Sequence, residues 1–145
     1  MSRVSGKNTK PEIIVRSLLH KSGYRFRLHR NDLPGKPDIV LPKYKKIIFV
    51  HGCFWHGHTA CRRSRRPATN TLFWNEKLDK NIKRDAENIA KLQKLGWEIL
   101  VVWSCEVHNK DTLKKKLLSF LQTEKSVIHG IKTNPKRVTE FNSRL

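Results

Sequence analysis

Apolar residues recur at helical spacing in three segments of the chain. Residues 9–22 begin with Thr9 and Glu12 at the spacing of a capping box. Residues 73–95 and residues 111–122 carry apolar side chains three or four positions apart. A glycine directly follows the first two segments, as is common where a helix ends. We therefore predict three helices at these positions.

Four shorter segments have the patterns of strands. Residues 24–28 alternate apolar and basic side chains, which is typical of a half-buried strand. The apolar runs 38–41 and 47–50 predict a hairpin centred near Tyr44. Residues 97–103 are almost continuously apolar, as in a strand that is covered on both faces. We expect this last strand in the middle of the sheet.

The order of these elements predicts a mixed α/β fold in which helices pack on a sheet. It runs helix, three strands, a long loop at 51–70, helix, strand, helix. Residues 1–122 would form a single domain, whereas residues 123–145 have little pattern and would be a loosely ordered tail. A chain of 145 residues can bury its own core but has no room for two catalytic domains.

The net charge of the chain predicts the kind of partner that it binds. The chain has 31 Lys and Arg against 12 Asp and Glu, a formal net charge of +19. Such an excess predicts a polyanionic partner, most often nucleic acid bound through its phosphates. A basic soluble protein without such a partner is the alternative. No apolar run approaches the roughly 20 residues that span a bilayer, and no signal core is present, so we expect no membrane contact and a cytoplasmic protein.

Cysteine and histidine gather in one part of the predicted loop. Cys53, His58 and Cys61 have a spacing close to that of zinc fingers. Cys105 follows strand 97–103 and is the remaining cysteine, which the fold can bring back to the loop. These four residues predict a closed, structural zinc site that holds the loop. The alternative is that the cysteines are small buried apolar residues and the histidine lies on the surface.

Asp38 stands out because the first 72 residues contain only two other acids. In a hairpin centred at Tyr44, Asp38 would lie beside the backbone of Val50 and near His51. An isolated carboxylate in a basic region suits Mg²⁺, which prefers oxygen ligands, although an Asp that merely begins a strand is the alternative. His51 and His56 could transfer protons at neutral pH, or could simply be packed or surface residues.

Aromatic and basic side chains accompany the loop. Phe54, Trp55 and Trp74 could stack on bases or wedge between them, although Trp74 could equally be a core residue of its helix. Four arginines are candidates for phosphate contacts, with a solvated charged run as the alternative: Arg62, Arg63, Arg65 and Arg66. One face of helix 73–95 carries polar residues spaced four apart: Lys77, Asn81 and Asp85.

Several segments are specific enough to identify a family. They are Leu33-Pro34-Gly35-Lys36-Pro37-Asp38, Phe49-Val50-His51-Gly52-Cys53-Phe54-Trp55-His56, Pro67-Ala68-Thr69 with Phe73-Trp74, Glu76-Lys77 with Lys80-Asn81, Leu95-Gly96-Trp97 and Val102-Trp103-Ser104-Cys105. With them, the chain closely resembles the very-short-patch repair (Vsr) DNA mismatch endonucleases over residues 1–107. The most specific signal is the His-Gly-Cys-Phe-Trp-His run downstream of a Pro-Asp pair.

The resemblance implies a fold and an activity. The fold would be restriction-endonuclease-like, with a mixed sheet flanked by helices and a zinc-held loop. The activity would be strand-specific, Mg²⁺-dependent nicking of duplex DNA on the 5′ side of the mispaired T in T:G mismatches. Such mismatches arise by deamination of 5-methylcytosine, and the nick initiates very-short-patch repair. The resemblance further implies a bacterial, cytoplasmic protein active at the nucleoid, acting as a monomer, with mismatch-repair proteins as candidate partners.

The resemblance also assigns catalytic roles to residues of this chain. Asp38 and the backbone carbonyl of Val50 would bind Mg²⁺. His56 would be the general base, oriented by Asp85, and His51 would assist at the scissile phosphate. Glu12 would be an accessory acid near the metal site. Three aromatic side chains would form a wedge beside the mismatch, and two polar residues would lie near the mismatched bases: Phe54, Trp55 and Trp74, and Lys77 and Asn81.

The chain departs from the family pattern in two places. Two residues separate His58 from Cys61, where the family often has one. The family commonly has a longer N-terminal arm that reaches the minor groove, and here only Met1 and Val4 could supply apolar contacts from that arm. Two other functions compete with the mismatch nuclease: a zinc-held DNA-binding module without catalysis, and a nuclease of the same fold that cuts unmodified sites or branched DNA.

Overall fold

The computed structural model describes residues 9–123 of the chain. The predicted contacts of Met1 and Val4 and the predicted tail lie outside these residues, apart from Thr123. No helix in the described part of the chain is long and apolar enough to cross a membrane.

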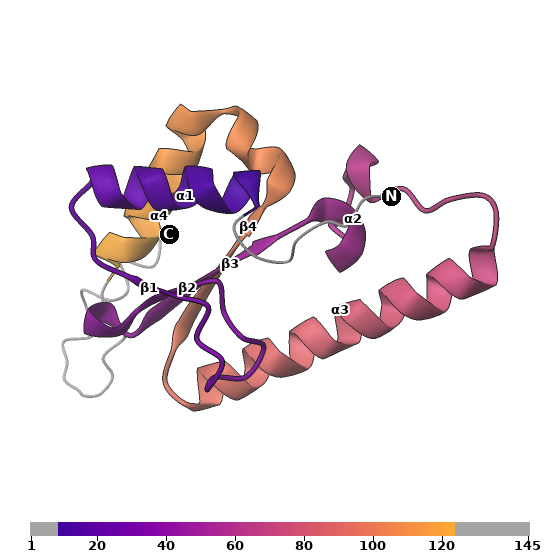
Figure 1. The fold of residues 1–145 in the computed structure, drawn as a ribbon, viewed down its shortest axis with the longest axis horizontal. Coiled ribbons are helices and arrows are strands. Elements are labelled where there is room, and N and C mark those ends of the chain that lie inside the picture. The colour runs from indigo at the N-terminus through magenta and orange to yellow at the C-terminus, as the bar shows by residue number, and fades with distance from the viewer. Residues whose placement is uncertain (1–8, 124–145) are drawn as a thin grey trace, which may run out of the picture.

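A four-stranded mixed sheet forms the centre of the fold, in the order β1-β2-β3-β4 (Figure 1). The strands are β1 (Arg27–Leu28), β2 (Ile39–Leu41), β3 (Lys46–His51) and β4 (Glu98–Trp103). The first three pair antiparallel, and β4 pairs parallel to β3. The predicted mixed sheet is therefore confirmed, although the strand expected over residues 24–28 contains only two strand residues.

Helices cover both faces of this sheet. They are α1 (Lys10–Lys21), α2 (Cys53–His56), α3 (Thr71–Lys94) and α4 (Lys110–Gln122), with shorter 3₁₀ turns η1 (Pro42–Tyr44), η2 (Arg62–Ser64) and η3 (Ser104–His108). Figure 1 shows α1 and α4 on one side of the sheet and the long α3 on the other. The three helices predicted from apolar spacing are thus present, and the segment expected to be a loop contains α2 and η2.

Alternate residues of the strands feed two separate cores, as the period of two along a strand requires. Ile48 and Val102 pack with α1 and α4, whereas Ile47, Phe49 and Val101 pack with the C-terminal half of α3. The same strands therefore contribute side chains to both cores, one core on each face of the sheet. Packing on both faces holds the sheet in place.

The expectation that residues 97–103 form a central strand is wrong. In the described part of the chain, β4 pairs only with β3 and lies at the edge of the sheet. Its continuous apolar run reflects the two covered faces, since Leu100 and Val102 contact one core while Ile99 and Val101 contact the other. Two covered faces and two neighbouring strands give the same sequence pattern, which is why the pattern could not separate them.

The hairpin also differs slightly from its prediction. Ile39 pairs with Ile48 and Leu41 pairs with Lys46, so the turn is centred between residues 43 and 44 instead of at Tyr44. The cause is the turn itself, in which η1 is followed by Lys45 in the left-handed region at φ +57°. Asp38 consequently lies one register position away from the place directly opposite Val50.

A buried lysine fixes the far end of the sheet to α4. Lys46 is 2% exposed, and its Nζ donates to Glu98 Oε1 at 2.8 Å and to the backbone carbonyls of Phe120 at 2.8 Å and Thr123 at 2.7 Å. These three acceptors satisfy all three ammonium protons. The contact therefore holds the last turn of α4 against β3 and β4.

Replacing this lysine should destabilise the fold. Lys46→Met removes the donor from two carbonyls and the partner from Glu98, and we expect the free energy of unfolding to fall by about 2–4 kcal/mol. Urea denaturation measures the change, with Lys43→Met in the exposed part of η1 as the matched control. Equal stability of the two variants would contradict this account.

Candidate active site and metal centre

Asp38 lies at the start of β2 with its carboxylate against the neighbouring strand. The Val50 N–H donates to Asp38 Oδ2 at 2.8 Å, so the predicted proximity of the two residues is present. Burial raises the pKa of Asp38 to about 6, while the hydrogen bond from Val50 acts in the opposite direction. A partly desolvated carboxylate of this kind gains from a nearby cation.

Glu12 and a histidine that sequence reasoning missed lie next to Asp38. The Glu12 side chain is 2% exposed, and its Oε2 is 2.6 Å from Arg16 Nη2 and 2.6 Å from His29 Nε2. The ligand atoms of Glu12, His29 and Asp38 all lie within 4.8 Å of one another. The Glu12 N–H also donates to Thr9 Oγ1, so Glu12 takes part in the predicted helix start as well.

His51, His56 and Asp85 form a second group on the other flank of the hairpin end. The imidazole rings of His51 and His56 are stacked with centroids 3.9 Å apart. His56 Nδ1 lies 2.6 Å from Asp85 Oδ2, so α3 holds the ring that ends α2. Burial first, and then the neighbouring His56, lower the pKa of His51 to about 4, which keeps His51 neutral at neutral pH.

These groups share one cleft. A cavity of about 230 Å³ is lined by Asp38, Val50, His51, His56 and Asp85, together with Lys36 and Asn88. A carboxylate suited to a divalent cation thus lies beside a histidine that a second carboxylate orients. This is the arrangement that metal-assisted hydrolysis needs, because one group binds the ion and the other can accept a proton from water.

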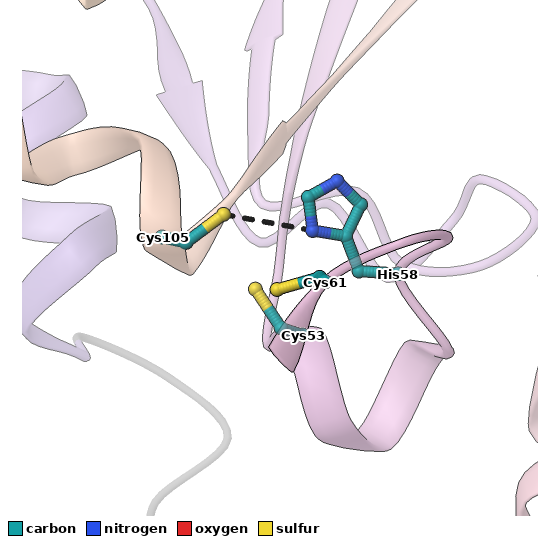
Figure 2. A group of neighbouring side chains, drawn as sticks. All are labelled: Cys53, His58, Cys61 and Cys105. Atoms are coloured by element: carbon teal, nitrogen blue, oxygen red, sulfur yellow. Dashed lines mark hydrogen bonds between the residues drawn. The ribbon is translucent and has the colours of Figure 1, made fainter. Parts of the chain in front are cut away.

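The four predicted zinc ligands meet at the base of the loop (Figure 2). The thiol sulfurs of Cys53, Cys61 and Cys105 and a ring nitrogen of His58 all lie within 4.8 Å of one another. His58 Nδ1 is 3.5 Å from Cys105 Sγ, and the His58 ring stacks on Trp103 with centroids 4.2 Å apart. Two distant parts of the chain, α2 with its following loop and η3, supply this set.

The chemistry of this cluster fits a tetrahedral metal ion. Burial and the neighbouring Cys53 and Cys61 raise the pKa of the Cys105 thiol to about 12. Several thiolates this close together repel one another, so their joint ionisation requires a cation among them. Three sulfurs and one imidazole nitrogen are a common ligand set of structural zinc. The cluster can therefore bind a metal, and the interpretation of its residues as separate buried or surface groups does not explain their convergence.

The predicted aromatic wedge forms a compact group. Ring centroids of Phe54, Trp55 and Trp74 lie 5.1 to 5.8 Å apart, and Trp55 is 41% exposed. Trp74 packs against these loop aromatics and against Phe73, which is 56% exposed and was not predicted as part of the group. Gly57 ends α2 in the left-handed region at φ +65°, and a Cβ at that position would collide with the side chain of Ile82 in α3.

The polar face of α3 contacts the same region. Asn81 Nδ2 donates to the backbone carbonyl of Trp55 at 3.1 Å, and Asp85 holds His56 as described above. Lys77 is exposed on the preceding turn. The four-residue spacing seen in the sequence thus brings three side chains of α3 towards one side, two of which fasten α2.

The four arginines of the loop differ in their surroundings. Arg66 donates to Asn75 Oδ1 at 2.9 Å and to Asp79 Oδ1 at 2.8 Å, which ties the loop to α3. Arg63 Nη2 lies 2.6 Å from His108 Nε2. Three of the arginines line an open pocket together with Ala60, Cys61 and Cys105: Arg62, Arg63 and Arg65.

Comparison with known proteins identifies the family. The family model of the DNA mismatch endonuclease Vsr matches residues 1–63. The type II nicking enzyme V.XorIIP of Xanthomonas oryzae pv. oryzae is 50% identical over 121 residues, which cover 83% of this chain and 88% of that protein. The DNA mismatch endonuclease Vsr of Escherichia coli is 42% identical over 119 residues, covering 82% of this chain and 76% of that protein. The chain belongs to the Vsr family.

The fold agrees with this assignment. The catalytic domain of the homing endonuclease I-Bth0305I superimposes with a TM-score of 0.55 at 19% identity, covering 78% of this chain and 94% of that domain. The predicted Vsr membership, the endonuclease fold and the nature of the protein as a DNA mismatch endonuclease are thereby confirmed. A Vsr endonuclease acts on DNA.

The pKa values of Asp38 and His51 are shifted in opposite directions, so the two residues should give opposite pH dependences of the free energy of unfolding. Because the pKa of Asp38 rises from 3.8 to about 6 on folding, its contribution to stability falls as pH increases through that range. Because the pKa of His51 falls from 6.5 to about 4, its contribution falls as pH decreases through that range. Each shift corresponds to about 3 kcal/mol.

Urea denaturation between pH 4 and 7 in Mg²⁺-free buffer tests both signs. Relative to the wild type, Asp38→Asn should become more stable by up to about 3 kcal/mol as the pH rises, and His51→Gln by a similar amount as the pH falls. Curves that run parallel to the wild type for both variants would show that neither environment perturbs its group.

Proposed function

We propose that this Vsr endonuclease uses Mg²⁺ to nick duplex DNA on the 5′ side of the mispaired T in T:G mismatches. Such mismatches arise by deamination of 5-methylcytosine, and the nick would initiate very-short-patch repair. The observation that supports the proposal most strongly is the single cleft shared by Asp38, the Val50 backbone, the stacked histidines and Asp85. The name of the E. coli relative, a DNA mismatch endonuclease, supports the substrate class.

Asp38 and the backbone carbonyl of Val50 would hold Mg²⁺ at one side of the cleft. When bound, this ion would offset the charge that develops on the scissile phosphate and favour ionisation of a bound water. The Val50 N–H orients the Asp38 carboxylate by donating a hydrogen bond to Oδ2. Glu12, next to Asp38, would be an accessory acid that adds negative charge beside the ion.

His56 would be the general base. With its Nδ1–H donated to Asp85, its Nε2 is left as the proton acceptor, and the carboxylate stabilises the imidazolium that forms when water loses a proton. His51 would assist at the scissile phosphate. Because the pKa of His51 is low, its stacked ring stays neutral and does not oppose the charge that His56 gains.

The aromatic group would supply selectivity for a mismatch. Phe54, Trp55 and Trp74 would insert beside the mispaired bases, and Lys77 and Asn81 would approach those bases. Unstacking costs less at a mismatch than at a paired step, so a wedge discriminates through the deformability of the DNA. Arg62, Arg63 and Arg65 would contact phosphates, whereas Arg66 could do so only in competition with Asp79.

The cluster of Cys53, His58, Cys61 and Cys105 would bind structural Zn²⁺. All four tetrahedral positions would be filled by the protein, which leaves none for substrate. The ion would link the end of β3, through α2, to η3 and so fix the aromatic group and His56. We further propose that residues 1–122 act as one endonuclease domain and as a monomer, with mismatch-repair proteins as partners.

Removal of the Asp38 charge should abolish nicking without abolishing DNA binding. Asp38→Asn should lower the rate of nicking about a thousandfold or more, because a metal ion supplies several kcal/mol to the transition state. The measurement uses an end-labelled duplex with one T:G pair, its C:G control, and Mg²⁺. Asp32→Asn, which removes an exposed carboxylate paired with Arg30, is the matched control and should keep full activity.

Three outcomes of this assay would contradict different parts of the proposal: the mismatch specificity, the metal role of Asp38 and catalysis itself. Equal cutting of the T:G and C:G duplexes would favour a nuclease of this fold with another specificity. Full activity of Asp38→Asn would remove the metal role of that residue. Tight binding without nicking in any methylase-type sequence context would favour a DNA-binding module.

Loss of one thiol should release the proposed zinc. Cys105→Ser should lower the zinc content, measured by elemental analysis, from about one ion per chain towards zero and should lower the melting temperature, because metal binding contributes directly to folding. His108→Gln, which changes a neighbouring histidine outside the cluster, should keep its zinc. A Cys105→Ser protein with unchanged zinc content and melting temperature would refute the assignment.

A further inference from the structure

His29 lies beside Glu12 and Asp38 but takes no part in the proposed mechanism. Its Nε2 lies 2.6 Å from Glu12 Oε2, and the ligand atoms of the three residues lie within 4.8 Å of one another. Asp38 lines the 230 Å³ cleft, whereas Glu12 and His29 are not among its lining residues. Glu12 and His29 therefore approach Asp38 from outside this cleft.

The backbone holds His29 in this place. Leu28 pairs with Ile39, and the His29 N–H extends this pairing by donating to the Asp38 carbonyl at 3.1 Å. His29 then adopts φ +47°, a left-handed conformation that costs a non-glycine residue of order 1 kcal/mol. Its side chain is nevertheless only 17% exposed, because it turns inwards towards Glu12.

The distances suit a single divalent cation. When an ion forms bonds of about 2.1–2.2 Å, its ligand atoms lie about 3–4.4 Å from one another in an octahedral arrangement. Donor atoms within 4.8 Å need only small side-chain adjustments to reach this geometry. Arg16 contacts the same Glu12 carboxylate, which has two oxygens and about four lone-pair sites and can serve both partners.

The donor set indicates which ions would bind. Two carboxylates alone suit Mg²⁺, which prefers oxygen ligands and retains several waters. An imidazole nitrogen in addition favours first-row transition ions, for which nitrogen donors raise affinity. The ion would replace the proton that His29 Nε2 shares with Glu12, and that proton would be released to solvent.

We propose that His29, Glu12 and Asp38 form a second divalent-cation site, adjacent to the proposed Mg²⁺ site and selective for Mn²⁺ or a related transition ion. The inference rests on the proposed function, because Asp38 would be shared between the two ions. His29 is then the residue that determines which metals this second site accepts.

The test measures metal binding in place of nicking. Zinc-loaded protein is titrated with Mn²⁺, free Mn²⁺ is counted by electron paramagnetic resonance, and pulsed measurements on the bound ion detect coupling to ¹⁴N of a coordinated imidazole. The wild type should show this coupling, and labelling of histidine with ¹⁵N should change it. His29→Gln should lose the coupling and bind Mn²⁺ about tenfold or more weakly. His20→Gln, an exposed histidine on the same α1 as Glu12, should match the wild type.

Bound Mn²⁺ without ¹⁴N coupling in the wild type would overturn the inference, and so would coupling that persists in His29→Gln. If the coupling disappears instead in His51→Gln, the nitrogen ligand belongs to the catalytic cleft and the inference is also wrong. His29→Asn replaces His29→Gln if thermal melting shows that the latter is unfolded. Nicking of the T:G duplex by Asp38→Asn decides the proposed function separately from all these results.

Discussion

The hydrogen bond from the Val50 N–H to the Asp38 carboxylate joins the fold to the site. It exists only because β2 and β3 pair in one register, and a shift by one residue would turn every side chain of the strand to the opposite face. That register is in turn fixed by the two cores, since Ile48 faces α1 and α4 while Ile47 and Phe49 face α3. Apolar packing on both faces thus determines where a single carboxylate lies.

Burial of charge is the cost of this arrangement. The carboxylates of the buried Glu12 and the half-buried Asp38 lie close together, and removing such charges from water costs free energy. The surrounding cations reduce the cost only in part, because Arg16 and His29 contact Glu12 while Asp38 retains a raised pKa. The same is true of the packed thiols, whose ionisation requires a cation. Both groups therefore make the metal-free protein less stable than a purely apolar core would.

The sequence predicted the elements whose patterns are local. The helices at residues 9–22, 73–95 and 111–122 and the hairpin followed from apolar spacing and turn residues, and all are present with ends shifted by a few positions. The sequence also predicted that Cys105 joins the cysteines of the loop, because it is the remaining cysteine and directly follows a strand. The parallel pairing of that strand with β3, which brings Cys105 to the end of β3, comes from the structure.

Non-local features could not be predicted in the same way. The edge position of β4 depends on which strands flank it, and its apolar run reports only that both faces are covered. His29 was missed because its proximity to Asp38 arises from the pairing of β1 with β2 and from a left-handed backbone, neither of which leaves a mark in composition or spacing. The short extent of β1 had a similar origin, since alternation at residues 24–28 continues beyond the paired residues.

The helix α3 couples three regions along one rigid axis. Its C-terminal part packs under the sheet through Leu92, its middle holds His56 through Asp85, and its first turn places Trp74 against the loop aromatics. A deletion of one residue between these points would shift one end by about 1.5 Å and rotate it by about 100° relative to the other. Lineages of this protein can therefore vary the exposed residues of α3 that make no such contacts, but not the length of the helix, so insertions and deletions should accumulate in the connecting loops instead.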